Sequence, residues 1–235
     1  LENLGFKKVI EKIQKENPNF IFSFYFRNIF PNKLLNIPKL GSINLHGSFL
    51  PKYRGAAPIN WQIINGEKNG GVTLHYMSEK IDKGKIIAQK KFYISKKDNP
   101  ISLFKKVEKK SQILLKETLP KIINETNCSF KQNEKNATYF GKRKPKDGKI
   151  AWDLPVLKIH NLIRGVTKPY PGAFTYLNKK KVYIWESRVE SLNSRNISSD
   201  IGSFYKAKKY IKVKTKDGTL VIRKFNIEKN KNAMK

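Results

Sequence analysis

The sequence predicts an α/β domain followed by a small β-barrel domain. In residues 1–128, apolar strand-like runs alternate with helical spacings of apolar residues, a pattern typical of a sheet covered by helices. Residues 129–150 are rich in Asn, Lys, Gly and Pro, which predicts a linker. Residues 151–235 carry short strands with hairpin signals, which predicts a small OB-like barrel.

The elements of the first domain follow from the spacing of its apolar residues. The continuous apolar run at 20–25 predicts a buried parallel strand. Pro58 is predicted to start a helix that closes at Asn65-Gly66. Further strands are predicted at 41–45, 72–77 and 86–90, and helices at 6–14, 31–35, 58–64 and 102–119.

The second domain is predicted to be mostly strands. A helix at 154–165 precedes them, and Lys216-Asp-Gly218 marks a tight turn. The strands are predicted at 173–177, 182–186, 202–205, 210–214 and 220–225.

The charge of the chain is its most unusual property. The formal net charge is +31, from 49 basic and 18 acidic residues. Its direct interpretation is a nucleic-acid or other anionic partner. Only seven of the basic residues are Arg, however, and the lysines are spread along the whole chain. Compositional drift on a solvated surface explains the charge equally well, so it favours an anionic substrate without selecting one.

The sequence gives no sign of a membrane span, a disulfide framework or a metal site. No run of about 18 apolar residues occurs, no signal peptide is visible, and Cys128 is the single cysteine. No metal-ligand spacing, G-x-G-x-x-G motif or Walker A loop is present. We therefore expect a cytoplasmic protein without metal or membrane insertion. The sequence makes no prediction about its oligomeric state.

Two polar residues end the strand predicted at 41–45. Asn44 and His46 are two residues apart, so both side chains leave the same face of a strand. They lie at its C-terminal end, the edge where open α/β sheets bind ligands. An amide can stabilise an oxygen that becomes negative, and an imidazole can move a proton near neutral pH. The pair therefore suits acyl-group chemistry, although such residues also occur as satisfied turn or core residues.

Two loops strengthen the functional interpretation of this pair. The loop after His46 is rich in Gly and Pro and carries Arg54, as a substrate-facing loop would. Asp82 lies in a second loop, where it is either an Asp-x-Gly turn residue or the acid that orients His46 and raises its pKa. His75, on the strand predicted at 72–77, is interpreted as a packing residue.

These residues together resemble a known active-site signature. Asn44-Leu-His46-Gly-Ser-Phe-Leu-Pro51, then Arg54-Gly55, then Asp82 before Gly84 is similar to the signature of the 10-formyltetrahydrofolate-dependent formyltransferases. The resemblance implies a Rossmann-like catalytic domain that uses 10-formyltetrahydrofolate as co-substrate and no metal. In it Asn44 would stabilise the oxyanion, His46 would shuttle the proton and Asp82 would tune His46.

The resemblance also implies two sets of binding residues. Those that would contact the folate co-substrate are Asn28, Ile29, Phe30, Ser78, Glu79, Lys80, Ile81 and Asp82. Those that would contact the acceptor substrate are Ser48, Arg54 and Gly55.

Blocks outside the signature resemble one branch of the family. This branch N-formylates the sugar nucleotide UDP-4-amino-4-deoxy-L-arabinose in the modification of lipid A, the lipopolysaccharide anchor. The blocks are 22–27, 58–61, 71–75, 138–143, 147–152, 171–176 and 185–189. Ala56 stands where this branch carries Arg. The family's sheet begins with roughly two βα units ahead of the position of Leu1, so we expect an N-terminally incomplete domain.

Three alternatives stay open. Methionyl-tRNA formylation shares the signature and the barrel, and the basic charge favours a tRNA partner. A non-catalytic protein that binds nucleic acid through a basic OB-type barrel belongs to another class of function. An inactive remnant of the enzyme is the third alternative.

Overall fold

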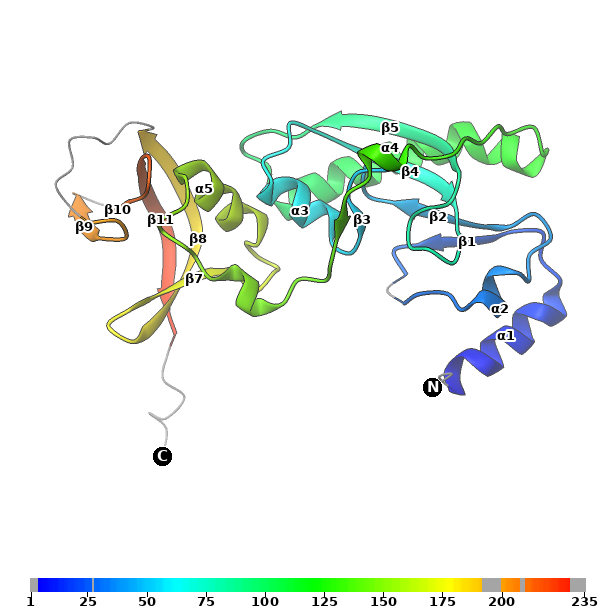
Figure 1. Ribbon diagram of the computed structural model, residues 1–235, viewed down its shortest axis with the longest axis horizontal. Helices are drawn as coiled ribbons and strands as arrows, with labels where there is room; N and C mark the ends of the chain where they lie inside the picture. The colour runs from blue at the N-terminus through cyan, green and yellow to red at the C-terminus, as the bar shows by residue number, and fades with distance from the viewer. Residues whose placement is uncertain (1–3, 27, 192–199, 208–209, 229–235) are drawn as a thin grey trace. The chain divides into compact units, whose positions relative to one another are not determined.

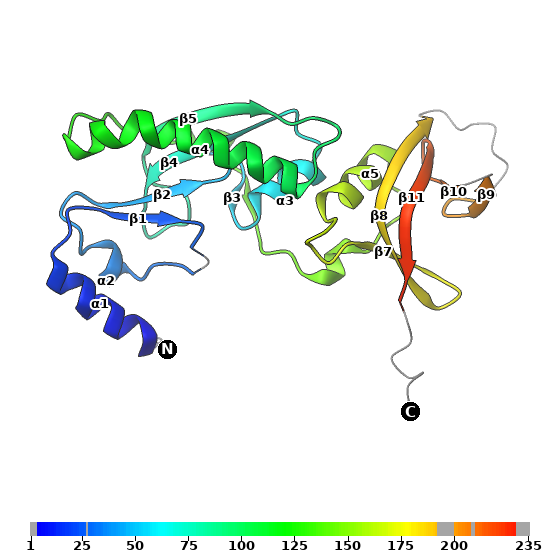
Figure 2. The ribbon, with the colours of Figure 1, turned by 180° about the vertical axis from the view of Figure 1, so that it is seen from behind.

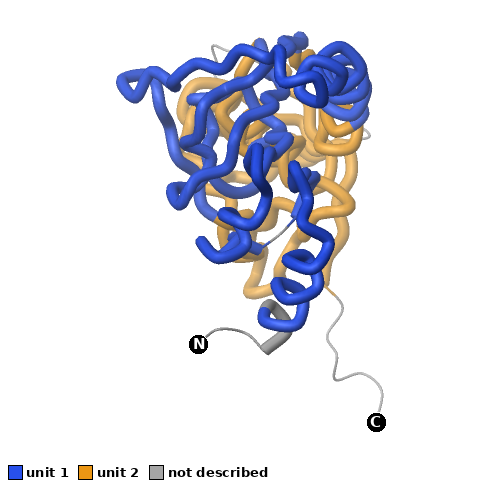
Figure 3. The backbone as a smooth tube through the Cα atoms, turned by 90° about the vertical axis from the view of Figure 1, so that its right-hand side faces the viewer, with its two compact units in different colours: residues 1–58, 69–93, 105–141 blue, residues 59–68, 94–104, 142–235 orange. Residues whose placement is uncertain are grey.

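The structure of this chain is a computed structural model, which describes residues 4–26, 28–191, 200–207 and 210–228. The chain forms two compact units, each with its own sheet (Figure 3). The first unit contains residues 1–58, 69–93 and 105–141, and the second contains residues 59–68, 94–104 and 142–235. The division predicted from sequence, 1–128, 129–150 and 151–235, stays a prediction.

The first unit is built on a mixed four-stranded sheet (Figure 1). Its strands, in spatial order, are β1 (Ile21–Phe24), β2 (Ser42–His46), β4 (Asn69–Tyr76) and β5 (Ile86–Tyr93). β1 runs parallel to β2, whereas β4 is antiparallel to both of its neighbours. The alternate apolar residues of β2 and β4, among them Ile43 and Leu74, are fully buried and form the core of this unit.

Helices flank this sheet, as the α/β pattern predicts. They are α1 (Leu4–Glu16), α2 (Asn32–Leu35) and α4 (Pro100–Ile123), which belongs to this unit from residue 105 onward. Helix α3 (Pro58–Ile64) belongs to the second unit from residue 59 onward. Helix α4 crosses in front of β4 and β5 in Figure 2. Its Val107 and Leu114, seven residues apart and hence on one helix face, are buried. Lys90 of β5 pairs with Glu117 of α4 at 2.7 Å. In the part of the chain that the structure describes, no helix is long and apolar enough to span a bilayer.

The run at 20–25 forms a parallel strand, as predicted, but the prediction that it is buried is wrong. Strand β1 is the edge of the sheet, and Phe22 and Phe24 are 36% and 46% exposed. An edge strand pairs on one side only, and among the described residues nothing pairs with its outer side. A continuous apolar run indicates the intrinsic preference for a strand, not the number of its neighbours.

The second unit is rich in β-strands. Its strands form a single antiparallel sheet in the order β7 (Ala173–Leu177), β8 (Lys180–Ser191), β11 (Thr219–Ile227), β10 (Tyr210–Lys214) and β9 (Phe204–Ala207). Helix α5 (Val156–Gly165) buries Ile159 and Ile163 against sheet residues that include Ile184 and Leu220. The predicted turn at 216–218 joins β10 and β11. The predicted fold class, an α/β domain followed by a small β-rich domain, is therefore confirmed.

The segment before the second sheet is structured. It contains the short helices η1 (Glu134–Asn136) and η2 (Pro145–Gly148) and strand β6 (Tyr139–Phe140). Strand β6 pairs in parallel with β3 (Arg54–Gly55), in the loop that follows β2. This pairing fixes the loop beside the polar end of β2.

Candidate active site

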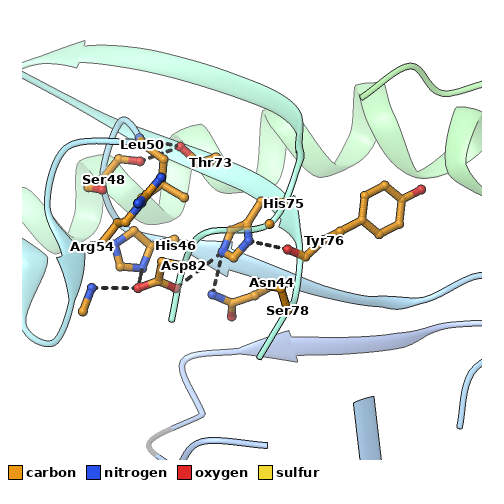
Figure 4. Close-up of polar contacts among 12 residues, drawn as sticks. Asn44, His46, Ser48, Leu50, Arg54, Thr73, His75, Tyr76, Ser78 and Asp82 are labelled. Atoms are coloured by element: carbon orange, nitrogen blue, oxygen red, sulfur yellow. Dashed lines mark hydrogen bonds and ion pairs between the residues drawn. The ribbon is translucent and has the colours of Figure 1, made fainter. Parts of the chain in front are cut away.

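The register between β2 and β4 gathers polar side chains on one face of the sheet. Asn44 lies opposite His75, and His46 lies opposite Thr73. Because side chains alternate along a strand, all four leave the same face. The first unit therefore presents two histidines and an amide at the C-terminal end of β2, the edge at which the sequence predicts a site (Figure 4).

His46 lies between two acceptors. Its Nε2 donates to the backbone carbonyl of Tyr53 at 2.7 Å, and its Nδ1 lies 3.5 Å from Oδ2 of Asp82. Burial lowers the pKa of His46, and the Asp82 carboxylate and the Tyr53 carbonyl act in the opposite direction. The ring is therefore neutral near pH 7, but its protonated form would find an acceptor beside each nitrogen. Those are the properties of a base that holds a proton transiently.

Asp82 sits between the two histidines (Figure 4). Its Oδ2 accepts the backbone N–H of Gly55 at 2.8 Å, and its Oδ1 lies 3.5 Å from Nε2 of His75. Burial alone would raise the pKa of Asp82, but the two histidines and the Gly55 N–H outweigh it and hold the pKa below its usual value. The carboxylate is thus ionised at neutral pH, as the predicted role of tuning His46 requires.

The backbone of Asp82 is in a strained conformation. Its φ is +52°, in the left-handed region that residues other than Gly rarely adopt. Gly84 follows where no side chain fits, because a Cβ there would lie 1.7 Å from the carbonyl oxygen of Tyr76. The Asp-x-Gly pattern is therefore a turn that also places the Asp82 carboxylate beside His46. Asp82 can be both a turn residue and the acid that orients His46.

His75, interpreted from the sequence as a packing residue, is buried and also belongs to this network. Its Nδ1 lies 2.8 Å from the carbonyl oxygen of Tyr76, so in the neutral ring the proton is on Nδ1 and Nε2 is an acceptor. Nε2 lies 3.2 Å from Nδ2 of Asn44, which therefore donates to it. This hydrogen bond sets the orientation of the Asn44 amide, whose other N–H has no partner among the described residues and can donate to a ligand. The alternation of Thr73 and His75 opposite Asn44 and His46 is the signal that could have identified it.

The residues predicted to bind the acceptor substrate differ in exposure. Gly55 is partly exposed, and its N–H holds Asp82. Ser48 is fully buried and donates to the carbonyl of Lys52 at 2.6 Å. Arg54 is also fully buried, and its five N–H groups all donate within the first unit, to Gln132, Glu134 and Tyr139. In this structure the side chains of Ser48 and Arg54 therefore support the loop.

The residues predicted to bind folate come from two neighbouring loops. The side chains in the first loop, Asn28 and Ile29, are exposed, as are those in the second, Ser78, Glu79, Lys80 and Ile81, while Phe30 and Asp82 are partly buried. Asn32 donates to the Glu79 carboxylate at 2.8 Å and so ties the two loops together. The exposed apolar surface of Ile29 and Ile81 suits a flat aromatic ligand.

This arrangement is suited to acyl transfer. It offers an oriented amide N–H, a neutral imidazole and an ionised carboxylate beside it, with a partly exposed backbone loop next to them. Among the described residues, no group of three or more His, Cys, Asp or Glu side chains is placed to hold a metal ion.

Comparison with known families covers both units. Residues 2–119 match the family model described as formyl transferase, and residues 142–235 match that of the formyl transferase C-terminal domain. Residues 120–141 lie outside both matches.

Individual relatives agree with these matches. The bifunctional polymyxin resistance protein ArnA of Wigglesworthia glossinidia brevipalpis is 50% identical over 192 residues, which is 80% of this chain and 29% of that protein. The chain therefore spans less than a third of the length of this relative. An N-formyltransferase from Helicobacter canadensis, solved with folinic acid and dTDP-3-aminofucose, is 30% identical with a TM-score of 0.69, over 86% of this chain and 72% of its own. WlaRD, a sugar 3N-formyltransferase solved with dTDP and 5-N-formyl-THF, is 27% identical with the same TM-score, over 89% of this chain and 75% of its own.

Proposed function

Because this chain belongs to the formyl transferase family, we propose that it transfers a formyl group from 10-formyltetrahydrofolate to the amine of a sugar nucleotide. The observation that carries the proposal is the cluster in which Asp82 lies 3.5 Å from both His46 and His75, with the Asn44 amide held beside them. The folate derivatives and the amino-sugar nucleotide bound by the solved relatives support it.

The proposed reaction is a direct transfer. The neutral amine attacks the formyl carbon, and the carbonyl oxygen becomes an oxyanion that accepts the free N–H of Asn44. His46 takes the proton released by the amine on Nε2, which is turned from the Tyr53 carbonyl toward the substrate, while the proton of the neutral ring is on Nδ1, directed to Asp82. The ring then gives this proton to the folate nitrogen as the C–N bond breaks. The products are a formamide and tetrahydrofolate, so protons and electrons balance.

The acceptor that we propose is UDP-4-amino-4-deoxy-L-arabinose. The sequence blocks shared with that branch of the family support this acceptor, as does the 50% identity to a polymyxin resistance protein. The excess of lysines supports an anionic substrate such as a nucleoside diphosphate sugar. Ala56, where the branch carries Arg, removes one cation from the acceptor side, so we expect the diphosphate to rely on other groups.

The predicted binding residues divide into two roles in this proposal. The residues at 28–30 and 78–82 contact the folate, and the exposed part of Gly55 faces the acceptor. Ser48 and Arg54 support the loop from inside, because their polar groups are already bonded within the protein.

The decisive experiment follows the release of tetrahydrofolate. The protein is incubated with 10-formyltetrahydrofolate and, in separate reactions, with UDP-4-amino-4-deoxy-L-arabinose, dTDP-3-aminofucose or methionyl-tRNA. We expect turnover with the amino sugars, and only a shallow loss of binding with salt, because a diphosphate carries few charges. Turnover with methionyl-tRNA alone, with a steep salt dependence, would replace the sugar acceptor by tRNA.

Two substitutions test the site itself. We expect His46→Ala and Asp82→Asn each to lower kcat by about 10²-fold or more, because each removes part of a positioned acid–base pair. The matched control is Glu117→Ala, which removes an exposed ion pair on α4 and should leave kcat unchanged. Wild-type turnover in either site variant, with the fold intact by circular dichroism, would rule out the proposed mechanism.

A further inference from the structure

The loop that carries Asp82 is held by a side chain from outside both matched domains. Gln132 is buried, and its amide makes four hydrogen bonds. Its Nε2 donates to the carbonyl oxygens of Asp82 and Gly84, both at 2.8 Å. Its Oε1 accepts from Nε of Arg54 at 3.0 Å and from Nη2 of Arg54 at 2.7 Å. All the polar capacity of this amide is therefore used inside the protein.

The chemistry of its partners allows only one orientation of this amide. Arg54 has donors only, and backbone carbonyls have acceptors only, so the amide oxygen must face Arg54 and the amide nitrogen must face the Asp82 loop. Gln132 thus joins the loop after β2 to the loop between β4 and β5. The first loop supplies the Gly55 N–H to the Asp82 carboxylate, and the second carries Asp82 itself.

The residues around Gln132 form one segment that runs along the site. Residues 130–140, here called the bridging segment, begin with paired backbone hydrogen bonds between Phe130 and Ile86 at the start of β5. Glu134 then pairs with both Lys83 and Arg54, at 3.1 and 2.9 Å. The segment ends at β6, beside Arg54 and Gly55. It therefore contacts both loops that hold the Asp82 carboxylate.

The backbone conformation of Asp82 explains why contacts from the bridging segment matter. A non-glycine residue at positive φ persists only where its surroundings hold it. Besides the two histidines, Asp82 is held by the Gly55 N–H, on its carboxylate, and by the Gln132 amide, on its own carbonyl oxygen. Both depend on the bridging segment, since Gly55 lies in the strand that pairs with β6.

We propose that Gln132 is a positioning residue of the active site, which holds the backbone of Asp82 so that its carboxylate reaches His46. Through Gln132 the bridging segment then supports the active site, and it is not a passive connection between two domains. The expected effect on kcat rests on the proposed function. The role of Gln132 in placing the Asp82 carboxylate beside His46 does not depend on which acceptor the protein uses.

Two variants separate the contacts of Gln132. Gln132→Glu is nearly isosteric and keeps an oxygen toward Arg54, but it turns an oxygen toward the carbonyls of Asp82 and Gly84. Gln132→Asn is one methylene shorter and withdraws the amide from one partner or both. The control is Lys131→Ala, an exposed neighbour in the same segment. We expect both Gln132 variants to lower kcat with little change in KM, by up to about a hundredfold, because the carboxylate is misplaced.

A second readout does not depend on turnover. The chain contains three histidines, so the imidazole of His46 can be titrated by NMR, with His160 of the second unit as an internal reference. Among the described residues, the titratable groups that face His46 are Asp82 and His75. The Asp82 carboxylate raises the pKa of His46, so Asp82→Asn should shift its titration to lower pH. Gln132→Asn, which adds no charge, should shift it in the same direction, and should add nothing in an Asp82→Asn background.

The outcomes are distinct. A folded Gln132→Asn variant with an unchanged His46 titration overturns the proposal, as does a shift in this variant that persists in full without the Asp82 carboxylate. If the wild-type chain turns over no acceptor but the titration responds to Gln132, the positioning role stands and the proposed function fails. If neither variant folds, hydrogen exchange of the Gln132 side-chain amide protons is measured in the wild type. Slow exchange supports the buried hydrogen bonds of Gln132 to the Asp82 loop, and rapid exchange refutes the proposal.

Discussion

The orientation of the Asn44 amide is the feature most open to a quantitative test. One of its two N–H groups donates to Nε2 of His75, and the other is free for the oxyanion. Substituting His75 by Asn places an amide near the former Nδ1, where it can still bond the Tyr76 carbonyl, but it removes the acceptor for Asn44. Substituting His75 by Gln places an amide oxygen near the former Nε2, where it can accept from Asn44.

The size of the effect follows from this one hydrogen bond. A neutral hydrogen bond contributes about 0.5–1.5 kcal/mol net, and 1.36 kcal/mol corresponds to a factor of about 10. Loss of the acceptor should therefore reduce the fraction of correctly oriented Asn44 by about 2-fold to 13-fold. The largest possible decrease in kcat is the one that follows complete loss of an oxyanion donor, about 10²-fold to 10³-fold. We expect His75→Asn to fall within the first range and His75→Gln to stay within about twofold of wild type.

A double-mutant cycle with Asn44→Ala isolates this pathway. The assay is kcat for tetrahydrofolate release, with thermal melting as the check on folding. If His75 acts through Asn44, His75→Asn should cost nothing further in the Asn44→Ala background. Equal losses in both backgrounds, or equal activities of the Asn and Gln variants, would refute this account of the His75 hydrogen bond.

Two further predictions concern stability. Burial and the nearby Arg164 lower the pKa of His160 to about 4. The contribution of neutral His160 to the free energy of unfolding should be complete above pH 6.5, the ordinary pKa of histidine, and should decrease by up to about 3 kcal/mol as the pH falls toward 4. Urea unfolding at pH 7 and pH 4.5 should therefore show a smaller pH dependence in His160→Asn, and an identical dependence would contradict the assignment. Arg54→Met strands the buried oxygen of Gln132 and should lower the free energy of unfolding by about 3 kcal/mol or more; a loss under about 1 kcal/mol in urea would show that its hydrogen bonds contribute little.

The local features of the site could be predicted from the sequence because they arise from short-range geometry. Asn44 and His46 share a face because side chains alternate along any strand. The loop after Pro51 and the turn at Asp82 follow from glycine and proline preferences, and Gly84 indeed has no room for a side chain. The resemblance to the formyltransferases rests on these same local residues, which is why the family matches agree with it.

Long-range pairing decided what the sequence could not. His75 is a partner of Asn44 only because β2 and β4 pair in one register, and a shift of one residue would turn its ring to the other face. The burial of the run at 20–25 was mispredicted for a related reason, since an apolar pattern does not say whether a strand has one neighbour or two.

The sequence by itself therefore determined the fold class, the family and the three residues that we propose to be catalytic, Asn44, His46 and Asp82. Tertiary structure alone decided how they are supported. Gln132 lies 50 residues from Asp82 and 78 from Arg54 along the chain, and it meets both only when separate loops fold together. The physical reason is that no repeating sequence pattern indicates which groups a side-chain amide will bond. Its donors and acceptors become specific only when burial leaves them no water to bond.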